Sequence, residues 1–203
     1  MITSVDSPID IKHVRGIEPG ASALFSADEF HRYGLERDLR PRGQPLMDAI
    51  AALMPRRLVA IGMNPSVANA FKPDPTITRE LGFARNWGCS LFSKGNLYGW
   101  VDPKPVKMWA EHRAGTDIVG PHNDDAIRTM LTMLKRDGGI ALACWGKMHS
   151  KGDHCLQEAR MMAMVRMADE VGVTWQCLGK NKDGSPKHPL YLPASARLES
   201  WPR

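Results

Sequence analysis

A short apolar run that ends abruptly in a polar loop constrains this chain more than any other feature. Residues 58–61 (Leu-Val-Ala-Ile) are apolar and partly β-branched, which predicts a buried strand. The loop that follows, Gly-Met-Asn-Pro-Ser over residues 62–66, ends the strand because Pro65 cannot continue a ladder of backbone hydrogen bonds. In open α/β sheets, ligands bind at the carboxyl ends of the strands. The sequence therefore predicts a ligand site at this strand end.

Strand-like and helix-like segments alternate along the rest of the chain. This alternation is typical of a mostly parallel sheet with helices on both faces. The chain has 203 residues, enough for one such domain. We therefore expect a single-domain, three-layer α/β sandwich over residues 46–203. Further strands are predicted over residues 90–98, 140–145 and 173–178, and helices over residues 46–54, 74–88, 106–113, 123–136 and 154–171.

The first 45 residues differ from the rest because glycine and proline interrupt them throughout. We expect an irregular N-terminal arm over residues 1–45, with at most one hairpin. Within it, residues 25–33 fit either a short helix or a strand at the sheet edge. A solvated surface explains the arginines of this arm more simply than contacts with phosphates: Arg32, Arg37, Arg40 and Arg42.

Composition and charge constrain the expected cellular location of the protein more than its function. The net charge of +5 is compatible with a polyanionic partner such as nucleic acid, although many basic proteins bind none. No apolar run is long enough to predict a membrane span, and no apolar core marks a signal peptide. The cysteines form no C-x-x-C pair, so we expect free thiols in the cytoplasm: Cys89, Cys144, Cys155 and Cys177.

Common catalytic and cofactor motifs are missing from the sequence. Ser66 lacks the G-x-S-x-G elbow of a nucleophilic serine, and there is neither a Walker A motif nor a G-x-G-x-x-G motif. His149, His154 and Cys155 lie near one another in the chain but match no specific metal-binding spacing. We expect no cofactor and no metal.

Three polar side chains, each predicted near the end of a different strand, fit one type of chemistry. An Asn presents both a donor and an acceptor, so Asn64 can hold an attacking water and Asn96 can read the edge of a base. A turn-forming role explains Asn96 equally well. A donor such as His188 stabilises negative charge that develops on an oxygen. Hydrolysis of an N-glycosidic bond needs a placed water and a stabilised leaving base, and in DNA it also needs a flipped nucleotide.

A series of motifs lies between residues 62 and 191. They are Gly-Met-Asn-Pro-Ser (62–66), Asp-Pro-Thr (74–76), Asn-Leu (96–97), Asp-Pro (102–103), Val-Gly-Pro-His-Asn-Asp (119–124), Cys-Trp-Gly (144–146) and Leu-Gly-Lys-Asn-Lys-Asp-Gly-Ser-Pro-Lys-His-Pro-Leu-Tyr (178–191). In order and spacing they resemble the bacterial and phage family called domain of unknown function 1643, over residues 46–192. That resemblance implies no particular activity.

A more distant resemblance is to the uracil-DNA glycosylase superfamily. Residues 62–65 are similar to the first motif of its mismatch-specific branch, where the Asn positions the water. Asn96 falls where the superfamily has a base-reading Asn, and Trp145-Gly146 looks like a later strand-to-loop step. His188-Pro189 is similar to the closing motif, where the His serves the leaving base and the loop enters the minor groove.

This chain departs from the superfamily pattern at three places. Ser66 stands where the mismatch branch has a small Gly, and Leu190-Tyr191 replaces the usual Ser-Pro. Asp74-Pro75-Thr76 has no counterpart. These departures bear on activity more than on fold, because a fold does not fix a function.

Together these observations give one leading hypothesis and two alternatives. The leading hypothesis is an N-glycosylase-like enzyme of uracil-DNA-glycosylase-like architecture that acts on a modified base in duplex DNA. The alternatives are a non-catalytic binder of modified DNA and an enzyme for a free nucleotide or another small substrate. We expect no membrane and no obligate protein partner. The expected catalytic residues are Asn64 and His188; the expected substrate-binding residues are Gly62, Met63, Pro65, Ser66, Asp74, Asn96, Tyr98, Trp145 and Gly146; and the expected phosphate contacts are Lys147, Lys180, Lys182 and Lys187.

Overall fold

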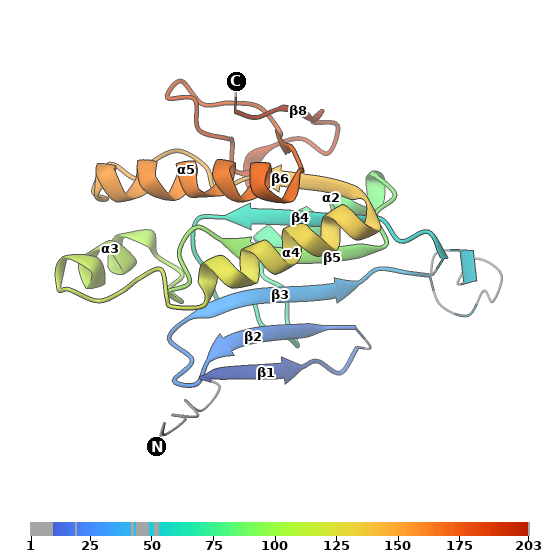
Figure 1. Cartoon of the computed structure of the whole chain (residues 1–203), viewed down its shortest axis with the longest axis horizontal. Helices are drawn as coiled ribbons and strands as arrows, with labels where there is room; N and C mark the ends of the chain where they lie inside the picture. Colours follow the sequence, from blue (N-terminus) through green and yellow to red (C-terminus); the bar gives the residue numbers. More distant parts are fainter. Residues whose placement is uncertain (1–9, 19, 42, 44–48, 51–52, 203) are drawn as a thin grey trace, which may run out of the picture.

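A mixed eight-stranded sheet with helices on both faces forms the fold of the computed structural model (Figure 1). The structure describes residues 10–18, 20–41, 43, 49–50 and 53–202. In the order β1-β2-β3-β5-β4-β6-β7-β8, the strands are β1 (Ile11–Arg15), β2 (Ser22–Ser26), β3 (Arg32–Asp38), β5 (Leu91–Asn96), β4 (Arg57–Gly62), β6 (Gly139–Ala143), β7 (Trp175–Cys177) and β8 (Glu199–Ser200). The helices are α2 (Pro75–Asn86), α3 (Pro105–Arg113), α4 (Asn123–Asp137) and α5 (His154–Val171), with a 3-10 turn η1 (Pro189–Tyr191).

The centre of the sheet is parallel and its two sides are antiparallel. Strand β4 lies between β5 and β6 and runs parallel to both, and β7 runs parallel to β6. Strands β1 to β3 and strand β8 join antiparallel. The prediction of a mostly parallel sheet therefore holds for the centre only. Short turns link β1, β2 and β3, and a short turn can join only antiparallel neighbours.

The N-terminal segment is more regular than its glycines and prolines indicate. Residues 11–15, 22–26 and 32–38 form β1 to β3 and extend the sheet beyond β5, so the expectation of an irregular arm is wrong for them. Of the alternatives for residues 25–33, the strand is the correct one, interrupted by a turn between β2 and β3. Arg32 and Arg37 are buried rather than solvated. The helix predicted over residues 46–54 lies largely outside the described residues.

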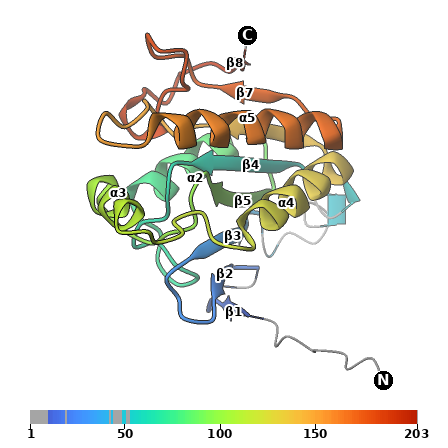
Figure 2. The ribbon, with the colours of Figure 1, turned by 60° about the vertical axis from the view of Figure 1, so that its left-hand side comes forward.

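Two apolar cores lie on opposite faces of the sheet. Helices α4 and α5 pack together on one face, in front of the sheet in Figures 1 and 2. Side chains of β4 alternate between the two cores, as a strand requires: Val59 and Ile61 face α4 and α5, whereas Leu58 and Ala60 face α2. The helix predictions beyond residue 70 agree with α2 to α5 to within one or two residues.

Helix α2 begins where the sequence predicts. The Asp74 carboxylate accepts a hydrogen bond from the Ile77 amide at 2.8 Å, and Pro75 occupies the first helical position. This end of α2 lies close to the loop after β4, and both contribute to the pocket described below.

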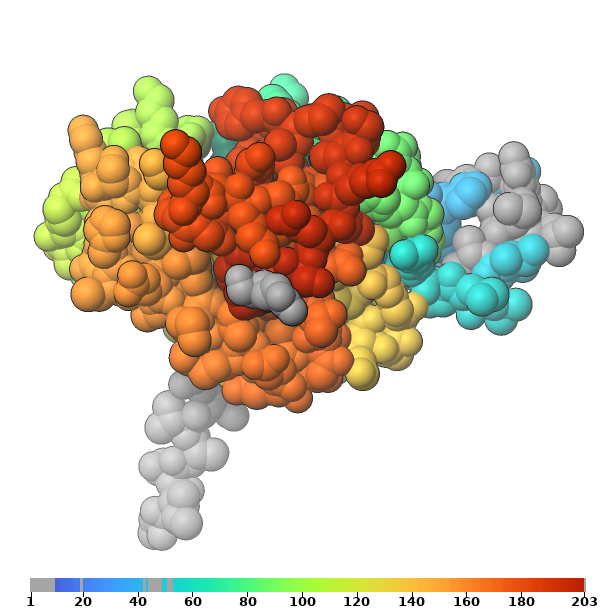
Figure 3. All heavy atoms as spheres, turned by 90° about the horizontal axis from the view of Figure 1, so that it is seen from above, coloured from blue at the N-terminus to red at the C-terminus, as the bar shows by residue number. Residues whose placement is uncertain are grey.

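The β8 side of the molecule is formed by the last third of the chain. Viewed from above, α5 and the segment that follows it (orange and red) make up most of this surface (Figure 3). None of the helices in the described part of the chain is both long enough and apolar enough to cross a bilayer. All four cysteines are free thiols.

Candidate functional site

A pocket of about 460 Å³ opens at the carboxyl edge of the central strands. Helix α2 connects β4 to β5 on one side, and the later chain places β6 on the other side of β4. This reversal of strand order creates a crevice, and ligands of open α/β sheets bind in such crevices. The pocket is lined by the ends of β4 and β5, the loops after β4 and β6, the start of α2, and η1 with His188.

The side chain of Asn64 is held in one orientation by backbone carbonyls. Its Nδ2 donates to the carbonyl of Asp102 at 2.7 Å and to that of Pro65 at 3.1 Å. Within the described residues, its Oδ1 accepts no hydrogen bond. Because Asn64 lines the pocket, this oxygen can accept a hydrogen bond from a water molecule there.

Asn96 is the last residue of β5 and pairs in register with Gly62 at the end of β4. Its side chain is only 2% exposed, and its Nδ2 has no partner among the described residues. Asn123, at the start of α4, donates to the carbonyls of Asn96 and Leu97 at 3.1 and 3.2 Å. A Cβ at Gly62 would lie 2.9 Å from the Asn96 Oδ1. The missing side chain of Gly62 therefore leaves space for the Asn96 amide.

His188 contributes a neutral imidazole. Its Nδ1 accepts a hydrogen bond from the Leu190 amide at 3.3 Å, so the proton of the neutral ring is on Nε2. Burial, followed by the charge of Lys94, lowers the pKa of His188 to about 4. Gly146 has φ of +83°, and a Cβ there would lie 3.3 Å from the His188 Cβ. Glycine at 146 thus permits both the turn after β6 and the close approach of His188.

We expect His188 to titrate near pH 4, well below an ordinary histidine. Because its pKa is lower in the folded than in the unfolded protein, protons bind the unfolded state more readily between these two values. The contribution of His188 to stability therefore falls as the pH drops from about 6.5 towards 4. NMR titration of the ring, assigned by comparison with His188→Asn, measures this value. A midpoint near 6.5 would contradict the lowering expected from partial burial and from the charge of Lys94.

Lys94 lies two residues before Asn96 on β5 and also lines the pocket. It is 4% exposed, and its Nζ donates to the Glu80 Oε1 at 2.6 Å. Burial acts to lower the pKa of Lys94, but the neighbouring Cys144 and Glu80 outweigh burial and raise it. A charged ammonium is therefore buried at the base of the pocket.

Arg32, the first residue of β3, reaches the same pocket. It is 2% exposed, and its guanidinium donates to the Ala68 carbonyl. Its Nε has no partner in the described part of the chain. Burial lowers the pKa of Arg32 to about 10, with Asp74 and Glu80 opposing the shift, so the side chain remains a cation at neutral pH.

Most of the residues expected at the site line this pocket, and five do not. Lys180, Lys182 and Lys187 belong to the loop before His188, outside the pocket, and contact of that loop with phosphates stays a prediction. Pro65 is not among the residues that line the pocket. Its carbonyl accepts a hydrogen bond from the backbone amide of Asp102 at 3.0 Å. The expected residues that line the pocket are Gly62, Met63, Asn64, Ser66, Asp74, Asn96, Trp145, Gly146, Lys147 and His188.

Tyr98 is the clearest correction among the expected site residues. Its ring is completely buried and packs edge to face on Trp109, with ring centroids 5.1 Å apart. Regular alternation would place Tyr98 on the same face as Asn96. The chain bends at Leu97, directly after β5, and this bend directs Tyr98 into the core instead.

The sequence prediction missed the two buried cations, Arg32 and Lys94. A lysine inside the buried run of β5 is unusual, because lysine is rarely buried without a partner. That anomaly is the signal that could have identified Lys94. The pocket also contains residues not expected there: Val67, Pro75, Thr76, Ile77, Pro103, Pro105, His149, Leu190 and Tyr191.

Within the described residues, no group of three or more His, Cys, Asp or Glu side chains is arranged to hold a metal ion. His149, His154 and Cys155 therefore do not form such a group. His149 instead lies near Gln157, whose Oε1 accepts from the His149 amide at 2.6 Å.

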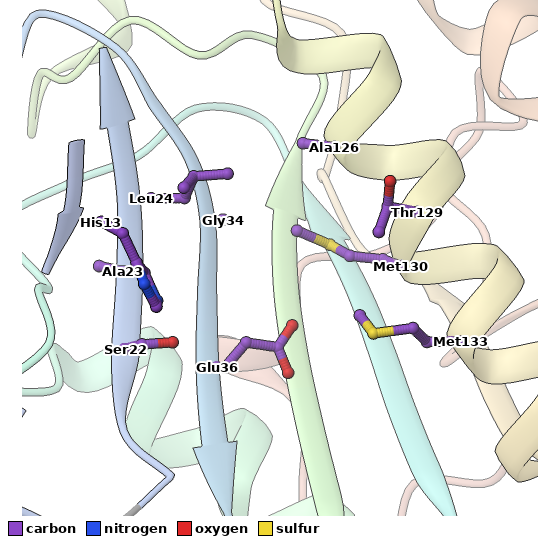
Figure 4. Close-up of a pocket in the computed structure, with 10 residues that line it drawn as sticks. All are labelled: His13, Ser22, Ala23, Leu24, Gly34, Glu36, Ala126, Thr129, Met130 and Met133. Carbon is purple, nitrogen blue, oxygen red and sulfur yellow. The ribbon is translucent and has the colours of Figure 1, made fainter. Parts of the chain in front are cut away.

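A second hollow of about 210 Å³ lies between strands β1 to β3 and helix α4 (Figure 4). Met130 and Met133 of α4 point towards it, and Glu36 of β3 enters it from the opposite side. It contains no residue expected at the site and only a few polar groups. We therefore place the candidate site in the larger pocket at the carboxyl edge, where several polar groups converge.

Comparison with known proteins gives one family and nothing more detailed. No curated protein and no solved structure matches the chain. None of the comparisons points to uracil-DNA glycosylases. The family described as "Protein of unknown function (DUF1643)" matches residues 32–190, which include the pocket residues from Arg32 to Leu190. The chain belongs to the DUF1643 family.

Proposed function

We propose that this protein is an N-glycosylase-like enzyme that hydrolyses the bond between the sugar and a modified base in DNA. The supporting observation is the convergence of Asn64, Asn96 and His188, from three distant segments, on one pocket. Their order along the chain, with Trp145-Gly146 between the last two, agrees with a uracil-DNA-glycosylase-like arrangement. The central parallel strands that carry Asn64 and Asn96 agree with it as well.

Asn64 orients the attacking water in this proposal. Its Nδ2 is fixed by the Asp102 and Pro65 carbonyls, which leaves Oδ1 as the acceptor for a water proton. The water oxygen forms the new bond to the sugar carbon while the bond from that carbon to the base breaks. The bonding electrons leave with the base, and the proton that the water loses passes to the departed base, so the products are a sugar hydroxyl and the neutral base. The sugar carbon is cation-like in the transition state.

His188 stabilises the departing base. The base becomes more negative as it leaves, and the charge is shared between its ring nitrogens and its exocyclic carbonyl oxygens. The Nε2–H of a neutral imidazole donates a hydrogen bond to such an oxygen, and the proton stays on the nitrogen. The low pKa of His188, about 4, keeps the ring neutral across the physiological range. A preorganised donor of this type is worth about 10²- to 10³-fold in rate.

The remaining parts of the proposal concern binding. Asn96 offers an unpartnered Nδ2 to the base edge. Tyr191, 83% exposed, lies at the pocket next to His188, where an aromatic ring can stack on a nucleotide. Lys147 lines the pocket, and the lysines of the loop before His188 extend the positive surface towards phosphates: Lys180, Lys182 and Lys187.

A panel of duplexes, each with one modified base, tests this function. We expect release of a free base, detected by mass spectrometry, together with an abasic site in at least one duplex. Duplex binding should weaken steeply with salt, because phosphate contacts release counterions. Salt-dependent binding without base release would indicate a non-catalytic binder of modified DNA. Turnover of free nucleotides without duplex binding would indicate the small-substrate alternative, and either result would refute the proposal.

A further inference from the structure

Side chains that line the site pocket carry hydrogen-bond donors that the protein itself does not use. Arg32 Nε, Asn96 Nδ2 and Trp145 Nε1 have no partner in the described chain. The three side chains are 2%, 2% and 3% exposed, and all three line the pocket. Buried polar groups are nearly always paired, so three unpaired donors among the residues that line one pocket point to a missing group that accepts hydrogen bonds.

Positive charge accompanies these donors. Arg32 and Lys94 are both buried and both line the pocket. No carboxylate of the described residues forms an ion pair with Arg32. Glu80 forms an ion pair with Lys94 but does not line the pocket, so Lys94 is the member of the pair that a ligand meets.

Asp74 is the one carboxylate among the described residues that line this pocket. Its Oδ1 is engaged by the amide of Ile77 at the start of α2. The amide nitrogens of that first helical turn add partial positive charge at the same place. With Lys147 also at the pocket, the lining residues carry an excess of positive charge over Asp74.

We propose that the pocket binds a negatively charged oxygen on the base, and that Arg32 and Lys94 supply the opposite charge. The oxygen belongs either to a carboxylate substituent of the base or to an exocyclic carbonyl of a base whose ring is ionised. The assignment of a nucleobase as the ligand rests on the proposed function. The inference that the bound oxygen is anionic rests on the unpaired donors and on the two buried cations, Arg32 and Lys94.

Calorimetric titration with free bases tests this inference at equilibrium. The probes are uracil, 5-carboxyuracil and 6-carboxyuracil, measured at constant salt between pH 7 and about pH 9, below the pKa of Arg32. If the oxygen is a carboxylate, we expect at least one carboxylated probe to bind more than 10-fold tighter than uracil at pH 7. If it is a carbonyl oxygen of an ionised base, we expect the affinity for uracil to rise more than 10-fold as its ring ionises. Equal and pH-independent affinities, or no binding by any probe, would overturn the inference.

Variants assign the preference to the two cations. Lys94→Met leaves Glu80 without its partner and can disturb folding, so Lys94→Met/Glu80→Gln removes both charges together. We expect the double variant and Arg32→Gln to reduce the preference for the anionic probe to less than threefold. Lys135→Gln, at the exposed end of α4, removes one positive charge far from the pocket and should keep the full preference. A folded double variant with an undiminished preference would refute the role of Lys94.

The binding test is independent of bond cleavage. A protein that prefers the anionic probe but releases no base from any duplex would retain this inference and refute the glycosylase proposal. A protein that releases uncharged bases and shows no preference for the anionic probe would do the reverse.

Discussion

Asn64→Ala and His188→Asn are each expected to slow base release by at least about 100-fold, the loss usual when one preorganised catalytic group is removed. Asn64→Ala removes the oxygen that holds the attacking water. His188→Asn keeps a side-chain acceptor near the Leu190 amide but loses the Nε2–H donor. Single-turnover rates on the duplex that the wild-type protein cleaves measure both effects.

Matched controls separate these roles from general damage to the fold. Asn86→Ala changes an exposed Asn at the end of α2, and His154→Asn changes an exposed His at the start of α5. Both controls should cleave at the wild-type rate. Wild-type rates in Asn64→Ala and His188→Asn would show that these side chains do not perform the proposed chemistry.

Arg57→Met is expected to destabilise the fold more than any surface substitution. Arg57 is 5% exposed at the start of β4. Its Nε donates to Asp137 at 2.9 Å, and one terminal nitrogen donates to Glu36 at 2.8 Å and to Ser93 at 2.6 Å. One side chain thus joins β3, β4, β5 and the end of α4. Loss of Arg57 leaves Glu36 and Ser93 without this donor and leaves Asp137 with Arg136 as its remaining partner in the described chain, at a cost of about 1–3 kcal/mol.

Urea denaturation of Arg57→Met and Arg128→Met measures this effect. Arg128 pairs with Glu170 between α4 and α5, where both side chains are about half exposed. Exposed pairs contribute about 0–1 kcal/mol, so Arg128→Met should unfold close to the wild-type midpoint. Equal midpoints for the two variants would show that the Arg57 network does not stabilise the sheet.

The stability that the Arg57 network contributes depends on pH through the ionisation of Asp137. Burial acts to raise the pKa of Asp137, but hydrogen bonds from Arg136 and Arg57 outweigh burial and lower it. A lowered pKa adds stability above the unfolded-state value, and this stability is lost as the pH falls through the folded-state value. Arg57→Met should therefore lose part of the acid sensitivity of the wild-type protein.

The central part of the fold follows from local patterns in the sequence. The apolar run of β4, the Asp74-Pro75 start of α2 and the amphipathic spacing of α4 are all short-range signals, and the structure has each element where they place it. The convergence of Asn64, Asn96 and His188 follows from their positions after predicted strands. It needs only the rule that parallel strands deliver their carboxyl ends to one edge.

The features that the sequence did not reveal depend on contacts between distant segments. Arg32 is buried where its guanidinium donates to the carbonyl of Ala68, in the loop between β4 and α2. Lys94 is buried because Glu80, on α2, pairs with it. The mixed sheet arises because β3 pairs with β5, a contact between residues far apart in the chain. Propensity and periodicity contain no information on such partners.

The most direct test of the central claim is a crystal structure with a duplex that carries a non-hydrolysable 2′-fluoro nucleotide at the modified base. The proposed function predicts that this nucleotide is flipped out of the duplex into the pocket at the end of β4. An oxygen of its base should lie within hydrogen-bonding distance of the His188 Nε2, and a water on the Asn64 Oδ1 should face the sugar carbon. A base that stays stacked in the duplex, or binds away from Asn64, Asn96 and His188, would contradict the account.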